Sequence, residues 1–207
     1  MELTTSKETI TNTSTIQIKK RDGRLEPLDI DKIHFVVEEA CEGLSGVSSS
    51  QIEINANIQF YDGMTTKEVQ QILVRSANDL ISLEAPNYQY AAARLLSYDV
   101  RKEAHGQYEY IPLLKLIMRN IRVGVYDKAI VEQFNKTEIK KMNTWIKRDR
   151  DLDFTYAGLR QVVDKYLVQD RSTGALYETP QDMYMMIAAT LFATVSYTHL
   201  RAHETET

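Results

Sequence analysis

The cations that could bind a phosphate gather near the start of the chain. Four of them flank a single Asp-Gly dipeptide: Lys19, Lys20, Arg21 and Arg24. Asp22-Gly23 is a strong hairpin-turn signal, and Asp29 shortly after it is a typical helix N-cap. N–H groups at a helix start bind anions together with nearby Lys and Arg side chains. The stretch therefore indicates a phosphate site, and the alternative is a solvated turn with exposed cations.

Two residues on other predicted helices could complete such a site. Thr66 would offer a hydroxyl and an N–H directly after the capping-box residue Thr65, although an ordinary first-turn residue explains it equally well. Lys102 would lie near a helix C-terminus, where the helix dipole alone already favours a cation. The sequence contains neither GxxxxGK nor GxGxxG, so a standard phosphate-binding loop is excluded.

Histidine and cysteine are scarce, which limits metal and thiol chemistry. His34 and His105 have no Cys, Asp or Glu partner at a metal-binding spacing, and we interpret His34 as a helix-surface or interface residue. Cys41 is the only cysteine, which excludes a disulfide and a cysteine zinc site within this chain. We therefore expect no metal site and no catalytic residue.

Two other clusters have a structural interpretation. The acidic run KRDRDLDF, residues 147–154, places no two carboxylates on one defined face, so we expect a solvated loop or helix boundary there. Flexible methionine side chains are typical of core packing rather than of a cofactor site. We expect this role for Met183, Met185 and Met186.

Composition places the chain among ordinary globular proteins of one or two domains. Its 207 residues are 43% hydrophobic and 26% charged. The net charge of -4 argues against a nucleic-acid partner, because such proteins usually have a basic excess. No apolar run of about 18 residues occurs, so we expect no membrane span. Residues 1–14 are polar and lack the apolar core of a signal peptide. We expect them to be a disordered lead-in and the protein to be cytoplasmic.

Hydrophobic periodicity predicts a mostly α-helical fold with one small β-hairpin at the start. We expect two compact units, with the division near Gly106. In the first unit we expect four helices, which begin near Asp29, residues 48–50, Thr65 and Pro86, and the last of them ends before Gly106. In the second unit, we expect helices at residues 111–121, 128–135, 138–147, 156–166 and 180–191, and a hairpin around Thr173-Gly174.

Several of these segments together resemble a known family. KKRDGRLEPLDIDKI, IQFYDGMTTKEV, ISLEAPNYQYAAARLL and VRKEAHGQ resemble the ATP-cone of class I ribonucleotide reductase large subunits. DRDLDFTYAGLRQVVDKYLVQDRSTGALYETPQDMYMMIAATLF resembles the helical N-terminal segment that leads into the catalytic barrel of the same subunit. The resemblance implies an ATP-cone regulatory domain of a hairpin and four helices at residues 15–106. It also implies a truncated N-terminal helical domain at residues 107–194.

The resemblance implies that the cone binds ATP or dATP, accompanied by Mg²⁺, as an overall activity effector. By their positions in the matching motifs, ten residues would contact the nucleotide: Lys20, Glu26, Pro27, Leu28, Asp29, Ile30, Asp31, Lys32, Thr66 and Lys102. The chemistry agrees, since lysines and a helix start attract phosphates and two of the apolar side chains could pack beside a base. Gln70 and Asp99 stand where some relatives carry histidines, which leaves open how ATP is told from dATP and how many nucleotides bind.

The family's chemistry would require parts outside the matching segments. Class I reductases reduce the ribose 2′-hydroxyl of ribonucleoside diphosphates with a thiyl radical and a redox-active cysteine pair. The large subunit forms a homodimer and receives the radical from a small subunit with a di-metal centre. Cys41 matches none of those cysteines, so we expect this polypeptide to be inactive alone. An inhibitory effector would favour an assembly in which the cone blocks radical transfer, which requires different affinities for two assembly states.

The last residues of the chain depart from the family pattern. VSYTHLRAHET, residues 195–205, can be read as a translation of the transposon-end sequencing adapter GTCTCTTATACACATCT continued by CCGAGCCCACGAGAC. We therefore expect residues 195–207 to be translated adapter sequence. On this interpretation, the i, i+4 pair of His199 and His203 is not a metal site.

Three other interpretations have different consequences. A transcriptional repressor with a free-standing cone would carry a four-cysteine zinc ribbon before it, but no cysteine precedes Ile16. The anaerobic, glycyl-radical reductase also has a cone, and the segment after Gly106 fits class I better. A degenerate cone that binds no nucleotide and acts only as a structural or subunit-contact module stays open.

Overall fold

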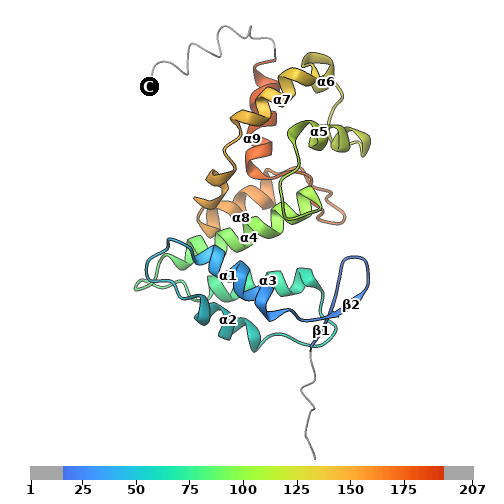
Figure 1. Cartoon of the computed structure of the whole chain (residues 1–207). Helices are drawn as coiled ribbons and strands as arrows, with labels where there is room; N and C mark the ends of the chain where they lie inside the picture. The colour runs from blue at the N-terminus through green and yellow to red at the C-terminus, as the bar shows by residue number, and fades with distance from the viewer. Residues whose placement is uncertain (1–15, 194–207) are drawn as a thin grey trace, which may run out of the picture.

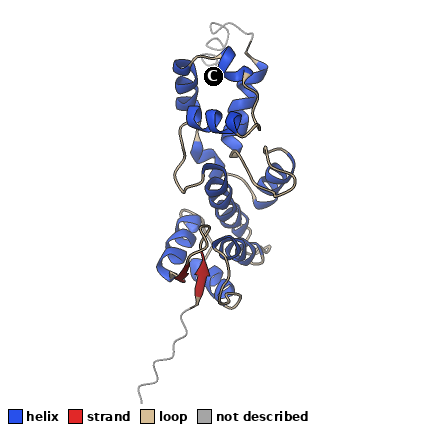
Figure 2. Ribbon diagram, turned by 90° about the vertical axis from the view of Figure 1, so that its right-hand side faces the viewer, coloured by secondary structure: helices blue, strands red, loops and turns tan. Residues whose placement is uncertain are grey.

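A computed structural model describes residues 16–193, which form an elongated, mostly helical molecule with one two-stranded hairpin (Figures 1 and 2). The hairpin and helices α1–α3 lie at one end, α5–α7 and α9 lie at the other, and α4 and α8 lie between them (Figure 1). The elements are β1 (Gln17–Lys19), β2 (Leu25–Pro27), α1 (Ile30–Cys41), α2 (Ser49–Asn57), α3 (Thr66–Asn78), α4 (Tyr88–His105), α5 (Leu113–Arg122), α6 (Ala129–Gln133), α7 (Lys136–Trp145), the 3₁₀-helix η1 (Arg148–Leu152), α8 (Tyr156–Lys165) and α9 (Pro180–Leu191). The predicted mostly helical fold with one small hairpin is confirmed.

The hairpin is tied to the start of α3. β1 and β2 pair antiparallel, with Ile18 opposite Glu26, and Gly23 takes a positive φ of 87° that the turn requires. The N–H of Lys19 donates to the Met64 carbonyl at 2.8 Å, just before α3 begins. These bonds hold the hairpin, with Lys20 and Arg21 at its turn, beside the N-terminus of α3.

The helix boundaries follow local signals in the sequence. The side chain of Asp29 accepts a hydrogen bond from the N–H of Lys32 and caps α1, as predicted. Thr65 and Glu68 form the predicted capping box of α3. The predicted start of α4 at Pro86 is two residues early, because Asn87 is the N-cap and Tyr88 the first helical residue.

The first hydrophobic core extends beyond the expected ATP-cone. It combines buried side chains of α1–α4 with Leu159 and Val163 of α8, Leu167 and Leu176 of the following loop, and Met183 of α9. The Arg94 side chain of α4 also donates to the Leu152 carbonyl of η1 at 3.4 Å. Residues 16–106 therefore share their core with the segment after them. A second, smaller core is formed by α5–α7 and the far side of α9, and it includes Ala189.

The hairpin predicted around Thr173-Gly174 is present in a short form. Gln169 and Leu176 form an antiparallel bridge, and the N–H groups of Asp170 and Tyr177 donate to the carbonyls of Ala175 and Val168 at 2.9 and 3.1 Å. The Asp170 side chain also accepts hydrogen bonds from the N–H groups of Ser172 and Thr173, which closes the turn locally. The two limbs pair over too few residues to count as strands of a sheet.

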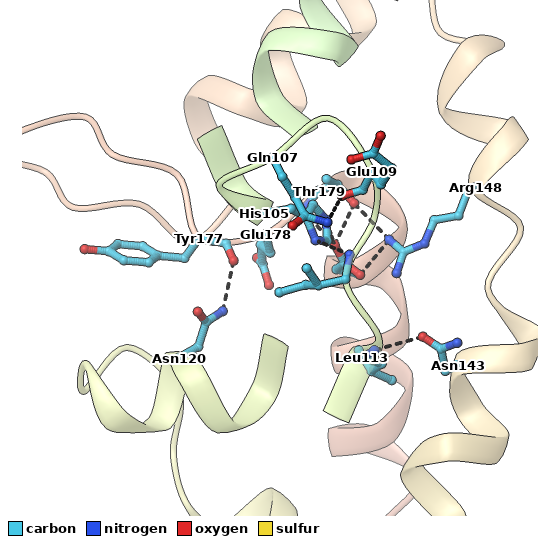
Figure 3. A network of polar contacts seen from close by, with 12 residues as sticks. His105, Gln107, Glu109, Leu113, Asn120, Asn143, Arg148, Tyr177, Glu178 and Thr179 are labelled. Carbon is cyan, nitrogen blue, oxygen red and sulfur yellow. Dashed lines mark hydrogen bonds and ion pairs between the residues drawn. The ribbon is translucent and has the colours of Figure 1, made fainter. Parts of the chain in front are cut away.

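A buried polar cluster joins the end of α4 to the start of α9 (Figure 3). His105 Nε2 lies 3.1 Å from Asp182 Oδ2, and both side chains are completely buried. Arg148 forms an ion pair with the other carboxylate oxygen of Asp182 at 2.6 Å. The N–H of Ile111 donates to His105 Nδ1, so in neutral His105 the Nε2–H donates to Asp182. His105 thus has a carboxylate partner after all, 77 residues away, where its sequence neighbours indicated none.

The acidic run at residues 147–154 is only partly solvated, so that expectation needs correction. Asp151 in η1 is fully buried, and neither of its carboxylate oxygens has a hydrogen-bond partner among the described residues. Burial raises the pKa of Asp151 to about 7. η1 packs against α4 and α9, and this packing turns one acid of the run inward. The methionine prediction is supported, since Met183 is buried in the first core and Met185 and Met186 pack against the second.

Among residues 16–193, no helix is long and apolar enough to cross a membrane. Within the same range, no group of three or more His, Cys, Asp or Glu side chains is arranged to hold a metal ion. The expected lead-in at residues 1–14 lies outside the described residues, and so does the expected adapter segment, which includes His199 and His203.

His34 joins α1 to α2 and should make stability depend on pH. Its Nδ1 lies 2.8 Å from Glu53 of α2, and its Nε2 lies 3.1 Å from Glu38 of α1. The hydrogen bond to Glu53 and the charge of Glu38 raise the pKa of His34. A raised folded-state pKa stabilises the fold fully below the ordinary histidine pKa of about 6.5, and the contribution is lost as pH rises through the folded value.

We therefore expect the melting temperature of the parent protein, relative to His34→Gln, to fall when the pH is raised from about 6 to about 8. The effect is modest because the side chain is half exposed. Thermal melts of both proteins across this range test it, and parallel pH profiles would contradict it.

Candidate functional site

A cavity of about 380 Å³ lies between the hairpin and helices α1, α3 and α4. Its walls combine apolar side chains with three lysines and a helix start. The lining residues are Ile18, Lys20, Leu28, Asp29, Lys32, Ile33, Phe35, Val36, Thr66, Val69, Gln70, Leu73, Lys102 and Tyr108. The size is within the range of small-molecule sites, and so is the mixture of an apolar lining with a few polar groups.

The apolar part of the cavity is built from two amphipathic helices and the first strand. Ile33 of α1 and Val69 and Leu73 of α3 are buried, and Ile18 of β1 closes the space between the two helices. Phe35 is 63% exposed although it lines the cavity, so a large aromatic face is available at the opening. This part of the cavity can take up a flat apolar group such as an aromatic ring.

The cations at the cavity differ in what they already bind. Lys20 pairs with Glu26 at 3.2 Å, and Lys32 pairs with its own N-cap Asp29 at 2.8 Å. Within the described part of the chain, the Lys102 ammonium forms no ion pair. Lys102 is therefore the cation that is best placed to take an anionic ligand.

The electrostatic surroundings of Lys102 favour an anion. Desolvation and the nearby cations Arg21, Lys20 and Lys32 lower the pKa of Lys102, with Asp99 acting in the opposite direction. The Arg21 guanidinium reaches the same place and donates to the Lys102 carbonyl at 3.2 Å. A bound anion would relieve the mutual repulsion of these cations.

Thr66 brings a helix N-terminus to the same wall. It is the first residue of α3, directly after the N-cap Thr65, which forms a capping box with Glu68. A smaller hollow of about 70 Å³ adjoins the cavity and shares Val36, Thr66, Gln70, Lys102 and Tyr108 with it. The polar side of the cavity therefore extends past Thr66 and Lys102 into this side hollow, which is also lined by Arg21, Lys67, Tyr98 and Asp99.

Six of the ten sequence-predicted residues line the cavity: Lys20, Leu28, Asp29, Lys32, Thr66 and Lys102. The other four, Glu26, Pro27, Ile30 and Asp31, do not. Glu26 forms ion pairs with Lys20 and Arg24, and the first of these pairs fixes the Lys20 side chain at the cavity. Ile30 is 51% exposed on the outer side of α1.

The sequence interpretation missed several lining residues. Phe35 and Val36 belong to α1, and their helical spacing from Lys32 could have indicated them. Tyr108 had no local signal, because it follows the helix-ending Gly106 and reaches the cavity only through tertiary folding. Its hydroxyl donates to the Glu39 carboxylate of α1, which fixes the ring at the edge of the cavity.

A larger hollow of about 560 Å³ lies elsewhere, among α6, α9 and the loop after α8. Its titratable lining residues are Tyr126, Asp127, Tyr166 and Glu178, and no cation is among them. Tyr126 and Glu178 already hydrogen-bond each other. The smaller cavity between α1, α3 and α4 is therefore the better candidate for binding an anionic ligand.

Most of the residues that line this cavity lie within a segment that matches a known domain family. Residues 16–103 match the family model of the ATP cone domain, and residues 152–205 match that of the ribonucleotide reductase all-alpha domain. The chain is 45% identical over 176 residues to ribonucleoside-diphosphate reductase 1 subunit alpha of Escherichia coli (strain K12). It is 40% identical over 178 residues to the subunit alpha of Haemophilus influenzae and 39% identical over 178 residues to that of Enterobacteria phage T4.

These similarities cover most of this chain and a small part of each relative. They include 85% of the chain but 23% of the Escherichia coli protein, and 86% of the chain but 24% of the Haemophilus influenzae protein. The chain thus spans about a quarter of the length of the relatives that it matches. Because the two domain models match in order and the identity runs through both, the chain belongs to the family of ribonucleoside-diphosphate reductase alpha subunits, with an ATP cone domain followed by the all-alpha domain.

Proposed function

We propose that the cavity between α1, α3 and α4 binds ATP or dATP as an allosteric effector. The observation that carries the proposal is Lys102, a cation without an ion pair among the described residues, at the polar side of an apolar cavity of about 380 Å³. A purine needs an apolar slot and a triphosphate needs cations and free N–H groups. The cavity provides both, on neighbouring walls.

The distribution of polar groups supports one orientation of the nucleotide. The base would occupy the space among Ile18, Ile33 and Leu73, where few polar groups compete for it. The phosphates would lie toward Thr66 and Lys102, where an ammonium and the N-terminus of α3 favour negative charge. Mg²⁺ would accompany the triphosphate, because it binds phosphate oxygens readily and neutralises part of their charge.

The whole subunit's activity is a further part of the proposal. In the intact subunit, this segment would regulate the reduction of ribonucleoside diphosphates to deoxyribonucleotides. The subunit would be a cytoplasmic homodimer that receives its radical from a small subunit with a di-metal centre. Cys41 is a poor thiol catalyst, because burial raises its pKa to about 11. We expect residues 1–207 alone to have a binding function and no reductase activity.

A titration of dATP, and then of ATP, into the whole chain tests the proposal. The whole chain is needed because the cone shares its core with α8. We expect micromolar binding, equivalent to about -8 kcal/mol. Lys102→Ala should weaken it at least tenfold, because a charge-assisted bond to phosphate is worth about 1.5–3 kcal/mol. Lys165→Ala is the matched control, since Lys165 also lies in the last turn of a helix and lines no part of the cavity.

A cone that binds no nucleotide is the second candidate. The ion pairs of Lys20 with Glu26 and of Lys32 with Asp29 favour it, because these cations are already neutralised. Gln70 likewise donates its amide to the Leu95 carbonyl at 2.8 Å. A folded sample that gives neither heat nor a thermal shift with either nucleotide would support this candidate, and the cone would then be a structural or subunit-contact module.

A further inference from the structure

Asp99 is an acid in a place where a nucleotide site would be expected to have only cations. It lies on α4, one turn before Lys102, and lines the side hollow together with Arg21, Lys67 and Thr66. It does not line the main cavity. Asp99 therefore stands beyond Thr66 and Lys102, on the side to which the phosphates of a nucleotide would extend.

The Asp99 carboxylate has no close partner within the described residues. No hydrogen bond or ion pair is formed by its oxygens there, although Lys67, Arg21 and Lys102 are all near enough to act on its charge. Lys67 is engaged by Glu103 at 3.0 Å, and Arg21 donates to a backbone carbonyl. Burial and the charge of Glu103 raise the pKa of Asp99. Its oxygens are not among the buried side-chain atoms that lack a partner, so they are accessible to a ligand in the side hollow.

Asp99 does more than balance the charge of the neighbouring cations Lys67, Arg21 and Lys102. The pKa of Lys102 is lowered by desolvation and by three cations in spite of Asp99. A closer acid would have paired with Lys102 directly, as Asp29 pairs with Lys32 at 2.8 Å. Asp99 instead lines the small hollow and forms no ion pair with Lys67 or Lys102.

A carboxylate beside a triphosphate repels it unless a divalent cation lies between them. Mg²⁺ is commonly bound by one or two carboxylates together with substrate phosphates, and it keeps several water ligands. The side hollow of about 70 Å³ has room for a hydrated ion next to the outermost phosphate. No group of three metal-ligating His, Cys, Asp or Glu side chains exists in the described part of the chain, so the cation would arrive with the nucleotide.

We propose that Asp99 is a protein ligand of the Mg²⁺ ion that accompanies the nucleotide, through its carboxylate or through a water bound to the ion. The cone would then select the magnesium complex of the nucleotide and reject the free one. This inference rests on the proposed nucleotide site. It adds a protein contact to the metal ion of that site.

The test is a titration of ATP into the whole chain in two buffers, one with excess Mg²⁺ and one with EDTA. We expect the parent protein to bind at least tenfold more tightly in Mg²⁺. Asp99→Asn should bind with affinities that differ by less than threefold between the buffers, because it loses both the repulsion of free ATP and the metal ligand. Asp79→Asn is the control, since Asp79 is an exposed acid at the end of α3 that lines neither hollow.

Each outcome separates this inference from the proposed function. Asp99→Asn should melt close to the parent, because no described hydrogen bond is lost, and Mg²⁺ without nucleotide should give no heat. Parent binding that is indifferent to Mg²⁺, or Asp99→Asn binding that keeps the full Mg²⁺ dependence, overturns the metal contact and leaves the nucleotide site standing. Absence of parent binding in both buffers overturns the proposed function and this inference with it.

Discussion

Asp182→Ala should lower the free energy of unfolding by about 3–5 kcal/mol, because it removes one partner of a buried charge cluster. The Asp182 carboxylate is fully buried and contacts His105 at 3.1 Å, Arg148 at 2.6 Å and the N–H of Thr179 at 3.1 Å. Alanine would leave the Nε2–H of His105 without an acceptor and would remove the ion pair of Arg148, whose guanidinium would keep its hydrogen bond to the Thr179 hydroxyl. His105 belongs to α4, Arg148 to η1, and Thr179 directly precedes α9 (Figure 3).

Urea unfolding followed by circular dichroism measures this effect. Asp164→Ala is the control, because Asp164 forms an exposed i, i+4 pair with Arg160 on α8 and should cost less than about 1 kcal/mol. Asp182→Asn provides a milder change if the alanine variant does not fold, and it should still be destabilised more than the control. A loss for Asp182→Ala no larger than the control's would mean that the cluster adds little to stability.

The same cluster should respond to acid. Burial alone would raise the pKa of Asp182, but the hydrogen bond from His105 and the charge of Arg148 hold it below the ordinary value of 3.8. A lowered folded-state pKa stabilises the fold above the unfolded value, and the contribution is lost as pH falls through the folded one. The difference in stability between the parent and Asp182→Asn should therefore shrink as the pH falls below about 4.

Leu159→Ala should destabilise the ATP cone domain although Leu159 lies outside it. Leu159 of α8 is completely buried, and its core contains residues of α1, α3 and α4. Removing a buried leucine side chain typically costs about 2–5 kcal/mol. Because the core is continuous, the loss should affect the cone and α8 together rather than α8 alone.

Hydrogen exchange followed by mass spectrometry can resolve where Leu159→Ala acts. We expect faster exchange in peptides from α3 and α4 as well as from α8. Leu83→Ala is the control, since Leu83 is 97% exposed and its loss should change stability by less than about 0.5 kcal/mol. Faster exchange confined to α8 would show that the cone folds independently, with a boundary near residue 106.

The elements of this protein were determined largely by local sequence signals. Asp22-Gly23 sets the turn, Asp29 and Thr65 cap their helices, and Pro180 begins α9, which spans residues 180–191 as predicted. Such signals act within about four residues, since caps and turns bond to backbone groups of their own segment. Six of the ten residues that the family resemblance implied line the cavity, and most of these six lie at helix starts or on the hairpin, where local signals set the backbone.

Only the tertiary structure decided which distant groups meet. His105 and Asp182 are 77 residues apart, and nothing in the sequence around either of them indicates the other. Asp151 is buried because η1 packs between α4 and α9, whereas its neighbours made the run look solvated. Tyr108 reaches the cavity because the chain turns back at Gly106, whose φ of 73° is of the left-handed kind. Burial and charge pairing depend on packing between elements, and so they are fixed only when the helices come together.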